Sequence, residues 1–197
     1  MKVEAFPRKA YLSWFFNLEG KQMNNVKKLV LTGLFIALGF VLPFLTLQNP
    51  TLGNILLLMH IPILLCGFIC GWQYGLAAGL VLPVFRSFTL GMPPMFPVAV
   101  VMSFELAAYG LFTGLLYKYL PKKNIFVYVT LVLAMVLGRM VWGTANWVIL
   151  GLKGASFTWE AFMGGAFITS LPGIILQLVL IPIIIIALKR ARLMENA

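Results

Sequence analysis

The sequence predicts an all-α integral membrane protein with six transmembrane helices. Hydrophobic residues make up 61% of the 197 residues, and charged residues make up only 10%. Soluble domains carry about 25% charged residues, so this chain has too few polar side chains to cover a soluble globule. The apolar residues also gather into six runs, each near the roughly 20 residues with which a helix crosses a bilayer. Together these observations predict a multi-pass helical bundle.

The predicted spans, in chain order, cover residues 28–47, 54–70, 72–90, 97–117, 124–150 and 165–188. Only the dipeptide GW separates the second span from the third. Gly67, Gly71, Gly75 and Gly79 surround this join, and they favour a tight hairpin over one long helix. The fourth span follows the proline-rich stretch SFTLGMPPMFP, in which few backbone torsions are free.

Basic residues predict the orientation of the spans. Of the 15 Lys and Arg, six precede the first span, three lie in KYLPKK at 118–123 and three lie in the tail LKRARLMENA. Outside these clusters, Arg86 and Lys153 fall on the other side, and Arg139 falls within a span. Cytoplasmic loops are enriched in Lys and Arg, so both termini are predicted to be cytoplasmic. No basic face is interleaved with base-stacking aromatics, so nucleic acid is not an expected partner.

The chain divides into three predicted parts. Residues 1–22 form a cytoplasmic N-terminal extension, 23–192 the six-helix membrane domain and 193–197 a cytoplasmic tail. The extension is either a short amphipathic segment on the membrane surface or a dispensable stretch before Met23 as the biological start. It lacks the apolar core and small-residue cleavage site of a secretory signal.

Polar residues inside the predicted spans define a candidate site. At about 1.5 Å per helical residue, His60, Glu105, Arg139 and Asn146 all fall in the outer third of the membrane. Charges at such depth are costly and mark functional sites by default. Two simpler interpretations remain open: Arg139 and Glu105 pair to tie two helices together, and His60 bonds a carbonyl freed by the nearby proline. The joint placement favours a small-molecule site that faces outward.

Two outer connections are apolar and rigid, as expected of a lid over a pocket. One is the stretch after Arg86, which contains Phe96 and three prolines. The other is TLQNPTLGN, whose hydrogen-bonding groups include Gln48 and Asn49. Two tryptophans beside Arg139, Trp142 and Trp147, are interpreted as pocket walls rather than as interfacial belt residues.

The absence of catalytic motifs favours binding over chemistry. The chain has no phosphate-binding G-x-x-x-x-G-K-[ST] loop, no H-E-x-x-H and no G-x-S-x-G. Cys66 and Cys70 are interpreted as packing residues, and no metal site is expected. Gly33 and Ala37, four residues apart in the first span, let another helix approach closely. That helix belongs either to the same bundle or to a partner protein.

Residues 23–192 resemble a substrate-binding (S) component of an energy-coupling factor (ECF) vitamin transporter, in the branch that includes pantothenate-type components. The resemblance rests on the six-span plan, the chain's size and the Gly33/Ala37 pair. Four further stretches carry it: HIPILLCGFICGWQYG, RSFTLGMPPMFP, FELAAYG and GRMVWG.

This resemblance implies a multi-pass protein of the bacterial plasma membrane with a ligand pocket under its first, third and fifth loops. It also implies partnership with one transmembrane coupling protein and two ATPases. The family's small-residue motif faces the coupling protein and falls here on Gly33 and Ala37, with Gly replacing the usual first Ala. No cofactor is expected in this chain, because ATP and magnesium are used by the partner ATPases.

Pantothenate, the expected ligand, carries a carboxylate, an amide and two hydroxyls. A buried guanidinium offers paired donors to a carboxylate, so Arg139 or Arg86 is expected to hold it. Glu105 is expected to orient Arg139 or to accept from a ligand hydroxyl. The predicted substrate-binding residues are Arg139, Glu105, Asn146, Trp142, Arg86, His60, Gln48, Asn49 and Phe96.

Three alternatives remain open on sequence grounds. The chain is an S component for cobalamin, pyridoxine, folate or another vitamin, or it is a stand-alone secondary carrier for a small organic solute. Secondary carriers often show internal inverted repeats, and none is visible here. The third alternative is an intramembrane enzyme that uses His60 and Glu105.

Overall fold

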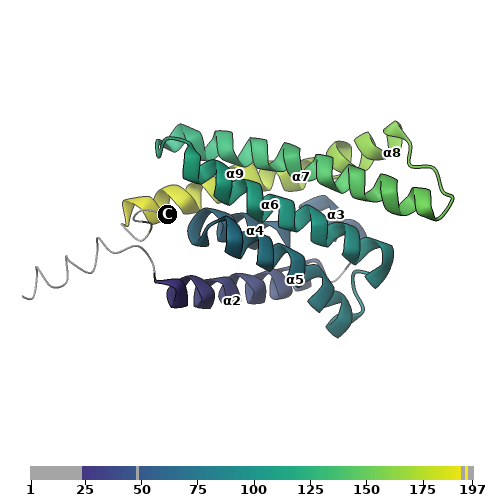
Figure 1. Ribbon diagram of the computed structural model, residues 1–197, viewed down its shortest axis with the longest axis horizontal. Helices are drawn as coiled ribbons and strands as arrows, with labels where there is room; N and C mark the ends of the chain where they lie inside the picture. The colour runs from purple at the N-terminus through teal and green to yellow at the C-terminus, as the bar shows by residue number, and fades with distance from the viewer. Residues whose placement is uncertain (1–23, 48, 192–193, 195–197) are drawn as a thin grey trace, which may run out of the picture.

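The computed structural model describes residues 24–47, 49–191 and 194, and no strand occurs among them. The helices run along the long axis of the molecule (Figure 1). In chain order they are α2 (Asn25–Val41), η1 (Leu42–Thr46), α3 (Pro50–Leu56), α4 (His60–Cys70), α5 (Trp72–Leu90), η2 (Met95–Ala99), α6 (Val100–Tyr119), α7 (Asn124–Leu152), α8 (Trp159–Met163), η3 (Gly164–Ile168) and α9 (Leu171–Arg190).

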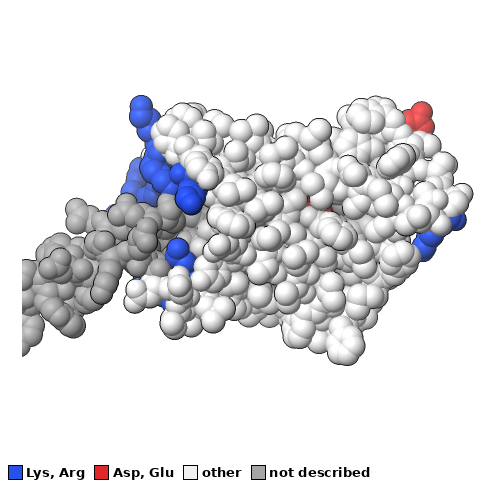
Figure 2. All heavy atoms as spheres, viewed as in Figure 1, with Lys and Arg blue, Asp and Glu red and all other residues white. Residues whose placement is uncertain are grey.

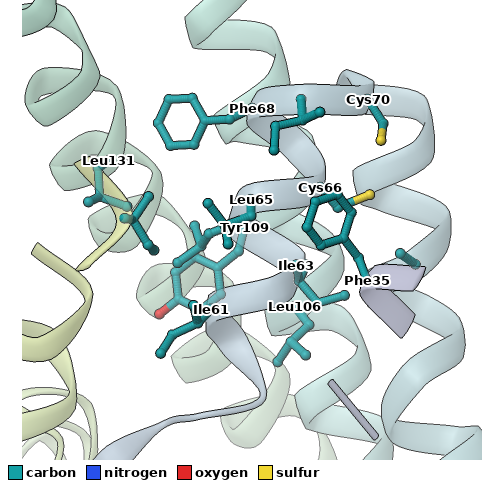
Figure 3. Close-up of a cluster of buried hydrophobic side chains, with 14 of the residues drawn as sticks. Phe35, Ile61, Ile63, Leu65, Cys66, Phe68, Cys70, Leu106, Tyr109 and Leu131 are labelled. Atoms are coloured by element: carbon teal, nitrogen blue, oxygen red, sulfur yellow. The ribbon is translucent and has the colours of Figure 1, made fainter. Parts of the chain in front are cut away.

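Helix α4 forms the centre of the bundle. All eleven of its residues are buried, and it packs against α2, α5, α6 and α9. A helix that is apolar on every side is stable only when it is enclosed, and the composition of α4 is of that kind. Figure 3 shows side chains of α4, such as Phe68, that point to different sides of the helix. They belong to one hydrophobic cluster, which also includes Phe35 of α2 and Leu131 of α7.

Glycines bring α5 and α6 into backbone contact. A Cβ added at Gly75 would lie 2.7 Å from the carbonyl oxygen of Gly110, and one at Gly79 would overlap the backbone of Ala107. One at Gly114 would meet the backbone of Trp72. As residue numbers rise along α5, the partners on α6 fall, so the two helices are antiparallel neighbours.

Among the described residues, five helical segments are long and apolar enough to cross a membrane: Asn25–Thr46, Thr51–Cys70, Met95–Tyr119, Asn124–Leu152 and Leu171–Arg190. The chain therefore has the all-α, multi-pass architecture that the sequence predicts. The remaining predicted span, 72–90, forms α5 with those same bounds. Helix α5 lies antiparallel along α6, and its crossing of the membrane, the sixth, stays a prediction.

The predicted division at GW is confirmed. Helix α4 ends at Cys70, α5 begins at Trp72, and Gly71 between them has a φ of 96°, in the left-handed region that glycine enters without steric cost.

The predicted span 54–70 lies within the candidate membrane segment Thr51–Cys70, but the chain does not form one continuous helix there. The chain breaks between α3 and α4, where Leu57 has a φ of 51°. Its carbonyl oxygen accepts from the backbone N–H of His60 at 3.0 Å and from Gln177 Nε2 of α9 at 3.4 Å. A second break, between η3 and α9, divides the predicted span 165–188 near Ser170. Both breaks border the same cavity.

Positive charge is concentrated at one end of the molecule. Figure 2 shows most Lys and Arg gathered at the end where α9 finishes, a small blue and a small red patch at the opposite end, and a belt almost without charge between the two ends. The described residues at this end are Lys27, Lys28, Lys118, Lys122, Lys123, Lys189 and Arg190. By the rule that basic residues stay inside, this end is the predicted cytoplasmic one. The predicted extension 1–22 and tail 193–197 lie outside the described residues, except Met194.

Candidate ligand-binding site

A cavity of about 650 Å³ opens toward the end opposite the basic cluster. That size lies within the usual range for pockets that hold small molecules. Its walls come from the broken segment around α3 and α4, the last turns of α5, the start of α6, the outer half of α7 and the turn before α9. The lining residues that carry polar side chains are Thr46, Asn49, Asn54, His60, Arg86, Glu105, Arg139, Asn146, Thr169 and Ser170.

Glu105 of α6 is the centre of a buried polar cluster in the cavity wall. Its Oε1 accepts from Arg139 Nη1 at 2.8 Å and from the Tyr109 hydroxyl at 3.2 Å. His60 Nε2 lies 3.5 Å from the same oxygen, without hydrogen-bond geometry. These four residues are between 1% and 4% exposed. The structure therefore brings together three of the predicted site residues, from three different helices.

The cluster leaves buried nitrogens without a protein partner. Arg139 uses Nη1 for Glu105, whereas its Nε and Nη2 have no hydrogen bond, and neither ring nitrogen of His60 has one. An unpaired buried polar group costs about 1–3 kcal/mol, and more when it is charged. Because Arg139 and His60 line the cavity, a ligand that bonds to these nitrogens removes this cost.

Packing fixes the position of each member of the cluster. The Tyr109 ring contacts the His60 ring edge-on, with centroids 5.3 Å apart. Gly138, the residue before Arg139, leaves the space that this tyrosine ring fills, because a Cβ there would overlap it. Helices α6 and α7 thus hold Glu105 and Arg139 in register through one large aromatic side chain.

Arg86 of α5 has a different set of contacts. Its Nη1 donates to the carbonyl of Phe40 at 2.7 Å and its Nε to the carbonyl of Met92 at 3.2 Å. The guanidinium also lies over the Phe44 ring, 5.6 Å from the centroid. Arg86 therefore connects the end of α2 to the proline-rich loop that forms part of the cavity wall. It is 3% exposed and lines the cavity.

Asn49, Asn146 and Trp142 also line the cavity. The Asn49 side-chain oxygen accepts from the backbone N–H of Thr51 at 2.9 Å and caps α3, and Asn146 Nδ2 donates to the carbonyl of Trp142 at 3.0 Å. Each side-chain amide therefore uses one of its two polar groups in a hydrogen bond to the backbone: the oxygen in Asn49 and the nitrogen in Asn146. The Trp142 indole packs on Phe162, with centroids 6.2 Å apart.

Other predicted residues lie elsewhere. Phe96 does not line the cavity; its ring is 55% exposed, with Lys153 Nζ 4.5 Å from the centroid. Trp147, interpreted from sequence as a pocket wall, is 64% exposed on the outside of α7. Gln48 is outside the described residues. Gly33 and Ala37 are exposed on α2, and a Cβ at Gly33 would meet nothing within 4 Å.

Sequence reasoning missed several residues of the site. Tyr109 follows Glu105 by four residues, so helical spacing placed both on one face of α6 and was an available signal. Thr169 and Ser170 enter the cavity wall only because the chain turns between η3 and α9. Ser170 followed by Pro172 is a pattern typical of a helix start, so it was an available signal for that turn.

Comparison with known proteins gives one match. No curated protein and no solved structure matches the chain. The family described as "ECF transporter, substrate-specific component" matches residues 27–185, which include every element from α2 to the middle of α9. This match agrees with a multi-pass bundle that has an enclosed polar site and an apolar outer belt. The chain belongs to the family of ECF transporter substrate-specific components.

Proposed function

We propose that this chain is the high-affinity substrate-binding subunit of an ECF-type ABC importer for a vitamin or related micronutrient, with pantothenate as the best candidate. The observation that carries the proposal is Arg139, whose Nε and Nη2 are buried without a partner beside a cavity of about 650 Å³. Binding at this cavity supplies the substrate recognition that membership of the family implies.

The cavity offers complementary groups for each part of pantothenate. The carboxylate bonds to Arg139, because a guanidinium edge and a carboxylate match in geometry and charge. The amide and hydroxyl groups meet the free ends of Asn146 and Asn49. The dimethyl group packs against apolar lining residues such as Met102 and Trp142.

Energy for uptake comes from outside this chain. We assign ATP binding and hydrolysis, with magnesium, to two partner ATPases, and assembly to a transmembrane coupling protein. The exposed pair Gly33 and Ala37 on α2 supports this assignment, because small residues on a free helix face allow close helix contact. The chain itself acts as a binding subunit and not as an enzyme.

A panel of vitamins tested on the purified chain by thermal unfolding identifies the ligand. A ligand at 100 times its Kd stabilises the folded state by about 2.7 kcal/mol, so pantothenate should raise the unfolding midpoint clearly. Cobalamin, pyridoxine and folate serve as the competing candidates. A shift with one of them and none with pantothenate would reassign the substrate. Uptake into liposomes by the chain alone would favour a stand-alone carrier instead.

The role of Arg139 is tested with Arg139→Lys, which keeps the charge beside Glu105 and removes the planar fork. We expect calorimetry to show affinity for pantothenate lower by about tenfold to 150-fold, the range for one charged hydrogen bond. Met140→Leu is the matched control, because the neighbouring Met140 is 58% exposed on the outside of the same helix. Equal affinity of Arg139→Lys and the native chain would remove Arg139 from the site.

A further inference from the structure

Three charged side chains line the cavity: Arg86, Arg139 and Glu105. The Glu105 carboxylate pairs with Arg139 at 2.8 Å, so these two charges cancel locally. Among the described residues no carboxylate lies within 4 Å of Arg86, whose partners are two backbone carbonyls and the Phe44 ring. Two positive charges and one negative charge leave these three side chains with a net charge of +1.

An unbalanced charge of this kind is costly where it lies. Arg86 is 3% exposed, and a buried ion is tolerated only when an opposite charge or several hydrogen bonds replace its hydration. Carbonyl dipoles replace that hydration but do not cancel the charge. A ligand with one negative charge brings the lined cavity to neutrality. A neutral ligand leaves it at +1, and a dianion takes it to −1.

The geometry of Arg139 specifies the shape of the anion. Its two unpartnered nitrogens, Nε and Nη2, form the side edge of the guanidinium, and their N–H groups point the same way. Glu105 accepts from Nη1, so Nη1 already has a carboxylate partner, and the edge formed by Nε and Nη2 is the one on which neither nitrogen is used. The remaining edge fits the two oxygens of one planar carboxylate. Glu105 thus acts as a positioning residue that selects which edge of Arg139 the ligand meets.

We propose that the cavity selects monocarboxylates by charge balance: Arg86 supplies the uncompensated positive charge, Arg139 supplies the fork, and Glu105 cancels the charge of Arg139. This inference rests on the proposed function, and it names the ligand class independently of which vitamin is bound. It also assigns Arg86 a role in specificity through its charge, in addition to its contacts with the loop.

Matched pairs of compounds test the charge rule by calorimetry on the purified chain. Each pair has a carboxylate and its neutral counterpart: pantothenate with pantothenol, nicotinate with nicotinamide, and biotin with biotinamide. Thiamine, pyridoxine, cobalamin and folate complete the panel as a cation, two neutral compounds and a dianion. In the pair that binds, we expect the carboxylate to bind about tenfold or more tightly than its counterpart.

Two substitutions shift the charge in opposite directions. Arg86→Met should remove most of the preference for the carboxylate, whereas Arg86→Lys should keep it. Glu105→Gln raises the net charge to +2, and it should improve the binding of the dianion N-pantoylaspartate relative to pantothenate by about tenfold. Lys123→Met is the matched control for loss of a cation, because Lys123 is exposed at the opposite end. If Arg86→Met does not fold, Arg86→Lys and Glu105→Gln still test the rule.

The outcomes separate this inference from the proposed function. Tight binding of a neutral, cationic or dianionic vitamin by the native chain would overturn the charge rule and leave the substrate-binding function intact. An unchanged ratio between dianion and monoanion in Glu105→Gln would also overturn it. Failure of the whole panel to bind would contradict the proposed function and the charge rule together.

Discussion

A single carboxylate oxygen organises the polar part of the cavity. Glu105 Oε1 accepts hydrogen bonds from Arg139 Nη1 at 2.8 Å and from the Tyr109 hydroxyl at 3.2 Å. His60 Nε2 lies 3.5 Å from the same oxygen. Because all of these side chains are buried, their positions depend on the packing of the residues around them. The least replaceable of these neighbours is Gly138, since its missing side chain is the space occupied by the Tyr109 ring.

Gly138→Ala should therefore destabilise the chain, although alanine is the better helix former. Overpacking of a core costs about 1–3 kcal/mol, which exceeds the gain of about 0.5–1 kcal/mol from replacing glycine within a helix. We expect a lower thermal unfolding midpoint. Displacement of Tyr109 should also weaken ligand binding.

Gly151→Ala on the same helix is the control for this substitution. A Cβ there would meet nothing within 4 Å, so this change should leave the midpoint unchanged or raise it. Equal midpoints for Gly138→Ala and Gly151→Ala would show that Tyr109 adjusts without cost.

Helices have a fixed rise per residue, so counting residues along each predicted span placed His60, Glu105 and Arg139 at a similar depth in the membrane. Phe96 and Trp147 were assigned to the pocket from their neighbours in sequence. Their exposure depends on loop geometry and on which face of α7 turns inward, and neither follows from spacing alone. The sequence therefore predicted the depth of the site in the membrane better than it predicted the residues that line the cavity.

At the scale of elements, prediction failed where a residue without a local signal changes the chain direction. Span 72–90 has the predicted bounds because Gly71 precedes it and Gly91 follows it, both with positive φ. The break at Leu57 has no such marker, since leucine rarely adopts a φ of 51°. It is held by tertiary contacts instead, through Gln177 of α9 and the burial of Leu57 itself.

A membrane crossing by helix α5 is a prediction that can be tested directly. Because α5 lies antiparallel along α6, which is a candidate membrane span, we predict that the two ends of α5 lie on opposite sides of the membrane. Gln73→Cys and Thr89→Cys place thiols at exposed positions near these ends, and the native Cys66 and Cys70 are buried. A membrane-impermeant maleimide should label T89C in intact cells and Q73C only after permeabilisation.

The unsubstituted chain measures the background of this experiment. Ser156→Cys and Lys123→Cys mark the predicted outer and inner sides, at exposed positions in the α7–α8 and α6–α7 connections. Labelling of T89C and Q73C from the same side would exclude a crossing by α5 and, with it, the six-span arrangement.

At the scale of the whole molecule, the proposed binding site and the proposed assembly site lie on different surfaces. The cavity opens toward the end opposite the basic cluster, whereas the exposed pair Gly33 and Ala37 lies on the outer face of α2. The buried face of α2 uses other residues, Thr32, Phe35 and Gly39. A change on the outer face should therefore affect contact with partners without altering the cavity.

Gly33→Leu and Ala37→Leu test this separation. A leucine at either position holds a second helix away from the α2 backbone, and close approach is what small residues provide in membranes. We expect both variants to bind ligand as the native chain does. Co-purification with the coupling protein and ATPases should fall by about tenfold or more, equivalent to about 1.4 kcal/mol of association free energy.

The matched control is Val132→Leu, which enlarges a side chain that is 46% exposed on α7, a different helix from the one that carries Gly33 and Ala37. It should assemble normally and support ATP-dependent uptake in liposomes that contain the complete complex. If Gly33→Leu and Ala37→Leu also assemble and transport normally, the partner surface lies on another helix. If they lose ligand binding as well, α2 and the cavity are coupled through the bundle, and the two surfaces are not independent.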